Sequence, residues 1–483
     1  MNEYFCYHYS MTKSAVLEKY HIEKDRLFFE ANVMGRVFST SIWYKNVDFH
    51  KLEREIGRYD LERLVAHIAA FEMNKYGSLH LDNVHLGDLT KYVDESFANL
   101  WHEIFLNVWG QWRYENNLPH DKPPKLIANS KRPKHEPISQ FSEEPVALAL
   151  FGGGKDSLVS THLLSKVGLV HDILEYSSSI YGNRAEQSDV KALAKVASTE
   201  AYINELVVFD DFLDSPIIEY DGQEYKIHTL AAAETPASLF EAIPLAIYSG
   251  YSSLALGHEK SSNYPNLNWL AEESAPINHQ WGKSLEAQML LASYLDEHLL
   301  RGLDYYSTLM PLSDPAIFTV LESLSWDLVK KAHSCNVSKP WCRRCAKCVY
   351  VWLFYLAFLD AEKVRDEVFG GENLFDVEEN HDILRMLAGK DVQTPFECVG
   401  QPGETLLALA LCIKKGFDKP IVKELLEGHD IQDFIDTATS QLDIDITFLR
   451  KCNLPELLSE YFETKLNPIL KQKAVSIVEA LKN

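Results

Sequence analysis

The sequence predicts an α/β protein with a Rossmann-like core, in which helices cover a parallel sheet. Three observations support this fold class. A short apolar run at Val146–Leu150 ends in three consecutive glycines, further short apolar runs follow it, and helical patterns lie between them. Strands that alternate with helices are typical of parallel sheets joined by right-handed crossovers. Because such sheets bind ligands at the carboxyl ends of their strands, we expect the functional site there.

Residues 1–116 form the first predicted unit, an N-terminal α+β domain. Alternating apolar residues predict two paired strands, Arg26–Val33 and Arg36–Tyr44. Apolar residues at helical spacing predict helices over Leu61–Asn74 and Ser96–Gly110. A stripe of large aromatic side chains is more often core than ligand cage, and we assign this one to the core: Trp101, Phe105, Trp109 and Trp112.

Residues 117–144 are rich in proline, lysine, serine and asparagine, a composition that predicts a linker or a surface segment. Residues 145–330 follow as the α/β domain that carries the parallel sheet. Its predicted strands are Val146–Leu150, Val170–Tyr176, Glu205–Phe209 and Ser253–Leu256.

Residues 331–400 hold a cysteine cluster and a helical segment, and residues 401–483 predict a helical C-terminal region. The longest apolar run, Val349–Leu359, is too short to span a bilayer and predicts a buried helix. Helical patterns further along the chain lie at Leu406–Lys415, Pro420–Leu426 and Pro468–Leu481.

The first predicted strand of the α/β domain leads into the most informative segment of the chain. After Phe151 come Gly152, Gly153, Gly154, Lys155, Asp156 and Ser157. A strand, a glycine turn and a helix N-terminus together aim backbone N–H groups at a phosphate. The spacing is not that of a Walker A loop. It resembles the S-G-G-x-D-S loop of the PP-loop (HUP-type) ATP pyrophosphatases, with Gly152 in the usual serine position. An ordinary glycine-rich turn is the alternative.

Four cysteines with the spacing C-x6-C-x2-C-x2-C form the second strong signal: Cys335, Cys342, Cys345 and Cys348. Four thiolates this close suit a structural, tetrahedral Zn²⁺. Two disulfides are the alternative, which a reducing compartment disfavours, and an iron–sulfur cluster is another. A phosphate loop followed by four cysteines resembles the arrangement in 7-cyano-7-deazaguanine synthase.

Three further clusters contain candidate catalytic side chains. His258 and Glu259 follow the predicted strand Ser253–Leu256, where they could bind a metal–nucleotide or transfer a proton. A capping-rich surface turn is the alternative there, and an elaborate helix cap is the alternative for the next cluster. That cluster holds His279 and Lys283, and the third holds Glu397 and Cys398. A lone cysteine is more often inert packing than a catalytic group.

Composition excludes some function classes and favours a large enzyme of the cytoplasm. The formal charge of −23 argues against nucleic acid as a partner, because phosphate neutralisation needs clustered lysine and arginine. We expect no membrane partner and no signal peptide, since the first residues lack a basic start and an apolar core. The expected partner is a small molecule.

Taken in order, the motifs resemble a specific family. They are Phe151–Ser160, Glu259–Asn263, Asn278–Ser284, Ser307–Ser313, Ser334–Asn336, Trp341–Cys348 and Pro395–Gly400. This set is similar to the ATP-dependent epimerases of UDP-N-acetylmuramoyl-L-alanyl-L-glutamate. The resemblance implies that a UDP-sugar-peptide, or another carboxylate substrate, is adenylated with ATP and Mg²⁺. It implies release of AMP and pyrophosphate, and inversion of the terminal L-Glu to D-Glu for peptidoglycan precursors.

The expected roles follow from that chemistry. The loop Gly152–Ser157 would hold pyrophosphate, Asp156 could bind Mg²⁺, and Lys155 or Lys283 could neutralise phosphate charge. The acid–base pair stays open among His258, Glu259, His279, Glu397 and Cys398. Two other functions also stay open: an adenylating amide- or nitrile-forming ligase similar to 7-cyano-7-deazaguanine synthase, and a non-catalytic nucleotide-binding module.

Overall fold

A computed structural model describes most of the chain. The described residues are 13–129, 135–139, 146–178, 184–212, 217–220, 223–226, 233–270, 275–335 and 337–483. Parts of the predicted linker 117–144, the first residue of the predicted α/β domain and Asn336 of the predicted motif set lie outside them.

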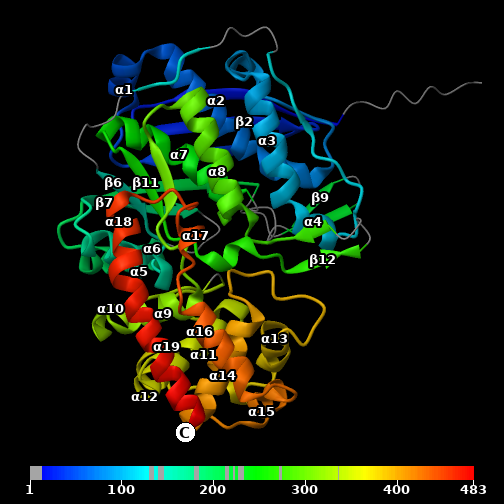
Figure 1. The fold of residues 1–483 in the computed structure, drawn as a ribbon. Helices are drawn as coiled ribbons and strands as arrows, with labels where there is room; N and C mark the ends of the chain where they lie inside the picture. The colour runs from blue at the N-terminus through cyan, green and yellow to red at the C-terminus, as the bar shows by residue number, and fades with distance from the viewer. Residues whose placement is uncertain are drawn as a thin grey trace, which may run out of the picture.

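The fold is a mixed α/β structure around a mostly parallel ten-stranded sheet (Figure 1). In spatial order its strands are β14 (Asp304–Ser307), β11 (Ser253–Leu256), β6 (Ala147–Leu150), β7 (His171–Ser178), β8 (Ile203–Asp210), β3 (Arg36–Tyr44), β2 (Arg26–Val33), β1 (Ser14–Ile22), β4 (Asn83–His85) and β5 (Lys125–Leu126). Neighbours from β14 to β8 run parallel, as the sequence predicted for this part of the chain. Two short hairpins complete the described strands: β9 (Ile217–Tyr220) with β10 (Gln223–Lys226), and β12 (Leu267–Trp269) with β13 (Ala275–Ile277).

The N-terminal strands extend this same sheet. Strands β1, β2 and β3 form an antiparallel meander, and β3 pairs antiparallel with β8 from Thr40–Asp210 to Tyr44–Leu206. The predicted strands Arg26–Val33 and Arg36–Tyr44 are confirmed at both ends. They form because their side chains alternate between the core and the surface, which period-two patterning requires. The segment predicted as a linker adds the edge strand β5.

Successive side chains of the parallel strands point into two different cores, one on each face of the sheet. Leu148 of β6 packs into one core together with helices α2, α3, α7 and α8. Ala147 and Ala149 pack into the other, together with α5, α9, α11 and α14. The predicted aromatic stripe from Trp101 to Trp112 lies in the first core, which confirms its structural role.

The helices of the first 330 residues cover the sheet. They are α1 (Phe49–Ile56), α2 (Arg58–Glu72), α3 (Glu95–Val108), α4 (Gly110–Glu115), α5 (Lys155–Lys166), α6 (Arg184–Ala197), α7 (Glu234–Ser249), α8 (Leu285–Tyr294), α9 (Asp314–Glu322) and α10 (Trp326–Val329). The predicted helices Leu61–Asn74 and Ser96–Gly110 correspond to α2 and α3 within a few residues at each end.

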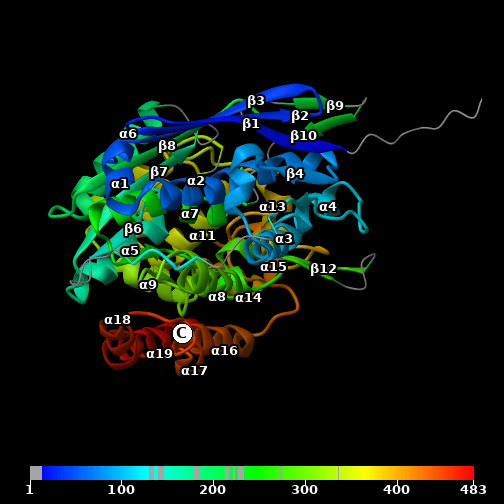
Figure 2. The same cartoon turned by 90° about the horizontal axis from the view of Figure 1, so that it is seen from above.

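The C-terminal region is helical, as predicted. Its helices are α11 (Ala346–Phe358), α12 (Ala361–Lys363), α13 (Glu379–Leu387), α14 (Pro402–Lys414), α15 (Pro420–Leu426), α16 (Ile431–Gln441), α17 (Ile446–Leu449), α18 (Glu456–Tyr461) and α19 (Asn467–Lys482). Every residue of α11 is buried, as its apolar run predicted. Figure 2 shows α16 to α19 together as an outer layer on one side. Within the described part of the chain, every helix is too short or too polar to traverse a bilayer.

Candidate active site

The predicted phosphate loop, Gly152–Ser157, lies at the carboxyl end of β6, a central parallel strand. After Phe151 the chain turns through Gly152, Gly153 and Gly154, and α5 begins at Lys155. Gly153 has a φ of 79°, a left-handed conformation that favours glycine. Gly154 is the N-cap residue and has no side chain to cap the helix, so no such group occupies the first N–H donors of α5. This local structure suits an anion.

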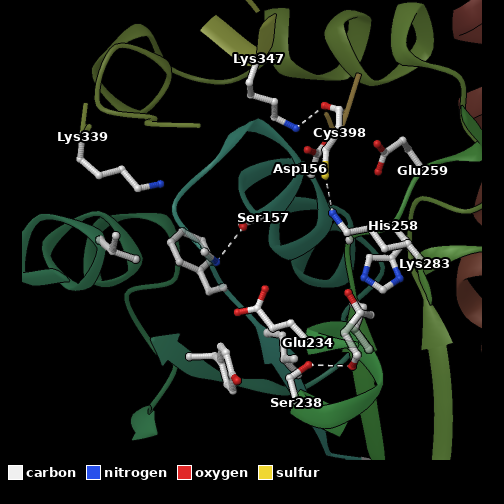
Figure 3. Close-up of a pocket in the computed structure, with 18 residues that line it drawn as sticks. Asp156, Ser157, Glu234, Ser238, His258, Glu259, Lys283, Lys339, Lys347 and Cys398 are labelled. Carbon is white, nitrogen blue, oxygen red and sulfur yellow. Dashed lines mark hydrogen bonds between the residues drawn. The ribbon is translucent and has the colours of Figure 1, made fainter. Parts of the chain in front are cut away.

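A cavity of about 300 Å³ opens beside this loop (Figure 3). Its wall combines the loop residues Gly152, Asp156 and Ser157 with side chains from β11, α7 and the segment around residue 398. Inside the loop, the Gly152 N–H donates to Ser157 Oγ at 3.0 Å. The motifs from residues 152–157, 257–259, 283 and 398 therefore line one pocket, although up to 246 residues separate them along the chain.

Three lysines supply positive charge to this cavity: Lys283, Lys339 and Lys347. Lys347 comes from α11, and its amine donates to the Cys398 carbonyl at 2.5 Å. Lys339 and Lys347 belong to the cysteine-rich segment of the sequence, and both side chains line the cavity. The three lysines offer positive charge to an anionic ligand, beside the carboxyl groups of Asp156, Glu234 and Glu259 in the same cavity wall.

Lys155 lies beneath the cavity rather than in its wall. Its amine is buried and donates to Asp156 at 2.5 Å and to Asp314 at 2.7 Å. Burial alone would lower the pKa of Lys155, but the two carboxylates raise it well above its usual value. In turn, burial alone would raise the pKa of Asp156, but Lys155 and Lys347 hold it below its usual value. Lys155 thus stays charged and fixes Asp156 at the cavity.

Gly400 packs directly against this buried group of charged side chains. A Cβ built at Gly400 would overlap the Tyr350 hydroxyl and the Glu404 carboxyl, and it would lie 2.7 Å from Asp314 Oδ2. Burial and the neighbouring Asp314 raise the pKa of Glu404 to about 8. The glycine of the predicted motif Pro395–Gly400 is therefore required by close packing.

Replacing Gly400 with alanine is expected to lower the free energy of unfolding by about 3 kcal/mol, because the new methyl group overpacks a rigid, charged site. Gly403→Ala is the matched control, since its added Cβ would meet nothing closer than Thr437 Oγ1 at 3.8 Å. That variant should change stability by less than about 1 kcal/mol. Denaturant titration of both proteins measures the difference, and equal stabilities would contradict the packing argument.

Cys398 is the most chemically distinctive group of the cavity. Lys283 Nζ donates to its sulfur at 2.8 Å. Burial alone would raise the pKa of the Cys398 thiol, but Lys283, Lys347 and the nearby His279 lower it well below its usual value. Burial alone would lower the pKa of Lys283, but Cys398 and Glu259 raise it. The pair is therefore a thiolate beside an ammonium, and thiolate is the nucleophilic and basic form of cysteine.

Alkylation of Cys398 by iodoacetamide is expected to depend on pH less steeply between about pH 6 and pH 9 than alkylation of an ordinary thiol, since its lowered pKa leaves more thiolate at low pH. An ordinary thiol, with a pKa of about 8.5, reacts about tenfold faster for each pH unit in most of this range. Lys283→Met should restore that ordinary dependence. Peptide mass spectrometry follows Cys398 alone, and an ordinary profile in the unmodified protein would refute the thiolate.

Glu259 and His258 follow β11 and face the same cavity. Burial and the nearby Asp156 raise the pKa of Glu259 to about 7, so this carboxyl can carry a proton near neutrality. Burial and then Lys283 lower the pKa of His258 to about 3, and its Nδ1 lies 3.1 Å from Ser307 Oγ. His258 is therefore a neutral hydrogen-bonding group.

The remaining predicted residues lie at the border of the cavity. His279 does not line it but lies beside Cys398, and its Nδ1 is 2.5 Å from Gln111 Oε1. Glu397 precedes Cys398 without lining the cavity. Gly153 and Gly154 face the other way, toward His333 and Ser334.

The four predicted cysteines come together in one cluster. All four sulfurs lie within 4.8 Å of one another, and two Sγ–Sγ distances are 3.9 and 3.7 Å. These distances exclude disulfides, whose sulfurs lie about 2.05 Å apart. A tetrahedral ion with metal–sulfur bonds of about 2.3 Å would separate its ligands by about 3.8 Å. Backbone N–H groups of Val337, Ser338 and Cys342 point at Cys335 Sγ at 3.3–3.4 Å, which suits a thiolate. The cluster can hold a metal ion.

The segment that leads into this cluster supports the phosphate loop. The His333 N–H donates to the Gly153 carbonyl at 2.9 Å. A Cβ on Gly153 would lie 3.0 Å from His333 Nε2, and a Cβ on Gly154 would lie 2.9 Å from Ser334 Oγ. The loop glycines are therefore needed on this side as well, because His333 and Ser334 occupy the space of a side chain.

Sequence reasoning missed several members of the site. Asp314 and Glu404 carry no motif of their own, and only their contacts identify them. One weak signal was present for Asp314, since it directly follows the motif Ser307–Ser313.

Comparisons with known proteins agree with the motif order. The chain matches the MurL N-terminal domain over residues 60–194 and 237–308, and the MurL C-terminal domain over residues 329–438. No solved structure matches it. Three related proteins bear the name UDP-N-acetyl-alpha-D-muramoyl-L-alanyl-L-glutamate epimerase.

The relative from Micromonospora sp. is 29% identical over 362 residues, which cover 72% of this chain and 75% of the relative. The relative from Salinispora tropica is 30% identical over 338 residues, covering 67% of this chain and 68% of the relative. The relative from Xanthomonas oryzae pv. oryzae is 26% identical over 366 residues, covering 73% and 75%. The phosphate loop, the cavity residues around Glu259 and the cysteine cluster all fall within the matched domains. The chain therefore belongs to the MurL family of UDP-N-acetyl-α-D-muramoyl-L-alanyl-L-glutamate epimerases.

Proposed function

We propose that this protein inverts the terminal L-Glu of UDP-N-acetylmuramoyl-L-alanyl-L-glutamate to D-Glu, at the expense of ATP, as a step toward peptidoglycan precursors. One observation carries the proposal: residues of the predicted phosphate loop line the same cavity as the thiolate–lysine pair Cys398–Lys283. Membership of the epimerase family supplies the substrate class.

The first step activates the glutamate carboxylate. A carboxylate oxygen attacks the α-phosphorus of ATP, the bond from that phosphorus to the bridging oxygen of the β-phosphate breaks, and pyrophosphate leaves. The product is an acyl adenylate. The loop Gly152–Ser157 and the N-terminus of α5 suit the departing phosphates, and Lys283, Lys339 and Lys347 suit their charge.

Mg²⁺ would accompany the nucleotide, and Asp156 is its proposed ligand. A carboxylate in the first turn of α5 repels a phosphate unless a cation lies between them. Because Lys155 and Lys347 keep Asp156 ionised, this carboxylate has the form that a hard divalent cation requires. Bound there, Mg²⁺ would neutralise part of the phosphate charge.

Adenylation makes inversion possible. Removing the α-proton from a free carboxylate would place a second negative charge beside the first, whereas an acyl adenylate no longer carries that charge. Cys398 is the proposed base: its thiolate takes the α-proton and becomes a thiol. Glu259 is the proposed acid, because its raised pKa keeps a proton available near neutrality. It protonates the opposite face of the carbon. Water then attacks the acyl carbon and releases AMP.

The cysteine cluster is proposed to bind a structural Zn²⁺. Its four thiolates have the spacing of one tetrahedral ion and leave no ligand position for a substrate. A cluster with several irons would hold its thiolates around a larger core. The zinc would thereby stabilise the segment that supports Gly153 and Gly154.

Incubation of the enzyme with ATP, Mg²⁺ and the L-Glu nucleotide in D₂O tests the proposal. Deuterium at the glutamate α-carbon, together with D-Glu, AMP and pyrophosphate, is the expected result. AMP and pyrophosphate release without deuterium uptake would point to an amide- or nitrile-forming ligase. ATP binding without any turnover over a broad substrate panel would point to a nucleotide-binding module. Formation of ADP would refute adenylation.

A further inference from the structure

His279 is held in one orientation by groups from both halves of the chain. Its backbone N–H donates to Asn266 Oδ1 at 2.8 Å, next to the β12–β13 hairpin. Its ring nitrogen Nδ1 lies 2.5 Å from Gln111 Oε1, on α4 of the N-terminal region. The ring also lies beside the Cys398 sulfur. Thus 168 residues of sequence separate His279 from the amide that contacts it.

The direction of the contact between Gln111 and His279 is fixed by a third residue. Gln111 Nε2 donates to Glu115 Oε1 at 2.8 Å, one helical turn further along α4. A carboxylate can only accept hydrogen bonds, so the NH₂ group of Gln111 must face Glu115. The amide oxygen is then left for His279. Because this oxygen can only accept, His279 Nδ1 carries the proton, and Nε2 is the nitrogen free for other chemistry.

Helix α4 is a rigid support for this arrangement. Trp109 and Trp112 are buried on either side of Gln111, and the Trp109 indole N–H donates to Asn74 Oδ1 at 2.6 Å. Helix α4 also packs against β13, which immediately precedes the segment of His279. The position of Gln111 relative to His279 therefore follows from the core of the molecule and not from a mobile surface side chain.

We propose that Gln111, oriented by Glu115, is a positioning residue that holds His279 with Nδ1 protonated and Nε2 available to the Cys398 thiol. This inference rests on the proposed function, in which Cys398 is the base. After the thiolate has taken the substrate α-proton, Nε2 accepts that proton from sulfur and the ring becomes an imidazolium. The proton then passes to solvent, and the thiolate is restored with no other change in bonds.

The consequence is that the N-terminal region completes the acid–base centre. The charged groups that face Cys398 are Lys283 and Lys347, with Asp156 and Glu259 beyond Lys283. His279 is the neighbour that can take a proton from the sulfur and return it, because the raised pKa of Lys283 keeps that lysine an ammonium group. Gln111 acts through His279 and does not line the cavity.

The experiment compares Gln111→Leu, Gln111→Glu and a matched control. The leucine variant keeps the size but removes the acceptor, whereas glutamate keeps an acceptor for the Nδ1 proton. Asn107→Leu is the control, because Asn107 Nδ2 contacts Glu103 Oε1 at 3.2 Å, also at i,i+4, on the adjacent helix α3 and away from the cavity. Two readouts are used: kcat and KM for epimerisation, and the pH dependence of Cys398 alkylation by iodoacetamide.

Gln111→Leu should lower kcat by about 100-fold, the low end of what a positioned proton-transfer group contributes. The KM values for ATP and for the L-Glu nucleotide should stay unchanged. It should also move the midpoint of Cys398 alkylation to higher pH. Gln111→Glu should recover most of both properties, and Asn107→Leu should match the unmodified protein.

Unchanged kcat and midpoint in Gln111→Leu would overturn the proposal. Equal losses in the leucine and glutamate variants would also overturn it, since they assign Gln111 to packing. If the unmodified enzyme failed to epimerise, the proposed function would fall, while the alkylation arm would still test the link from Gln111 to Cys398.

Discussion

Replacing Cys398 with serine will reduce epimerisation by about 1,000-fold while AMP and pyrophosphate release continue. A serine hydroxyl does not ionise near neutrality, so the variant lacks the base that removes the α-proton, and such groups contribute about 10²–10⁴-fold. In the proposed mechanism, adenylation depends on the loop Gly152–Ser157 and the cavity lysines, which the substitution leaves in place. The adenylate would form, remain L-configured and hydrolyse.

Separate assays of the two half-reactions check this prediction. Deuterium exchange at the α-carbon reports the proton transfer, and AMP release reports activation. Cys452→Ser is the matched control. Burial raises the pKa of Cys452 to about 12, and its sulfur donates to the backbone carbonyl of Phe448. Loss of AMP release in Cys398→Ser would move this cysteine into the activation step, and full exchange would remove it from the mechanism.

Removal of the metal from the cysteine cluster is expected to cost both stability and nucleotide chemistry. Structural Zn²⁺ contributes about 10–16 kcal/mol to the folding of zinc-finger peptides, which sets the scale for such a site. The segment ordered by the cluster carries His333, whose N–H donates to the Gly153 carbonyl, and Ser334, which packs against Gly154. Without the ion this segment loses its anchor, and the phosphate loop loses one wall.

Cys345→Ser is the direct test. The variant should bind less zinc, unfold at a lower temperature and release less pyrophosphate, all three together. Cys412→Ser serves as the control, since Cys412 is buried in α14 away from the cluster. A Cys345→Ser protein that keeps a full complement of zinc yet loses activity would show that the cluster has a role beyond structure.

Local patterns were enough to predict many, though not all, of the elements of this fold. Strands such as Ser253–Leu256 are short apolar runs followed by glycine, and α11 carries the long apolar run that begins at Val349 and can only be stable when buried. The four cysteines lie within 14 residues of sequence, so their spacing alone predicted a cluster. In each case one short segment contains the whole signal.

Contacts between distant segments could not be predicted in this way. Lys283 and Cys398 are 115 residues apart, and nothing in either segment shows that the amine will meet the sulfur. The motif around Lys155 is compatible with two roles for this lysine, a phosphate ligand or a buried partner of a carboxylate. The structure pairs it with Asp314. The roles proposed for His258 and Glu259 also depend on burial, which moves their pKa values in opposite directions although the two residues are adjacent.

The pairing of β3 with β8 has a consequence for any effort to divide this molecule. A fragment that began near residue 146 would keep the residues that line the cavity but would expose the edge of β8, which β3 now covers along five residue pairs. Bare strand edges recruit other chains. Such a truncated protein would aggregate through β8, and the excised catalytic half would be recovered as insoluble material rather than as a smaller enzyme.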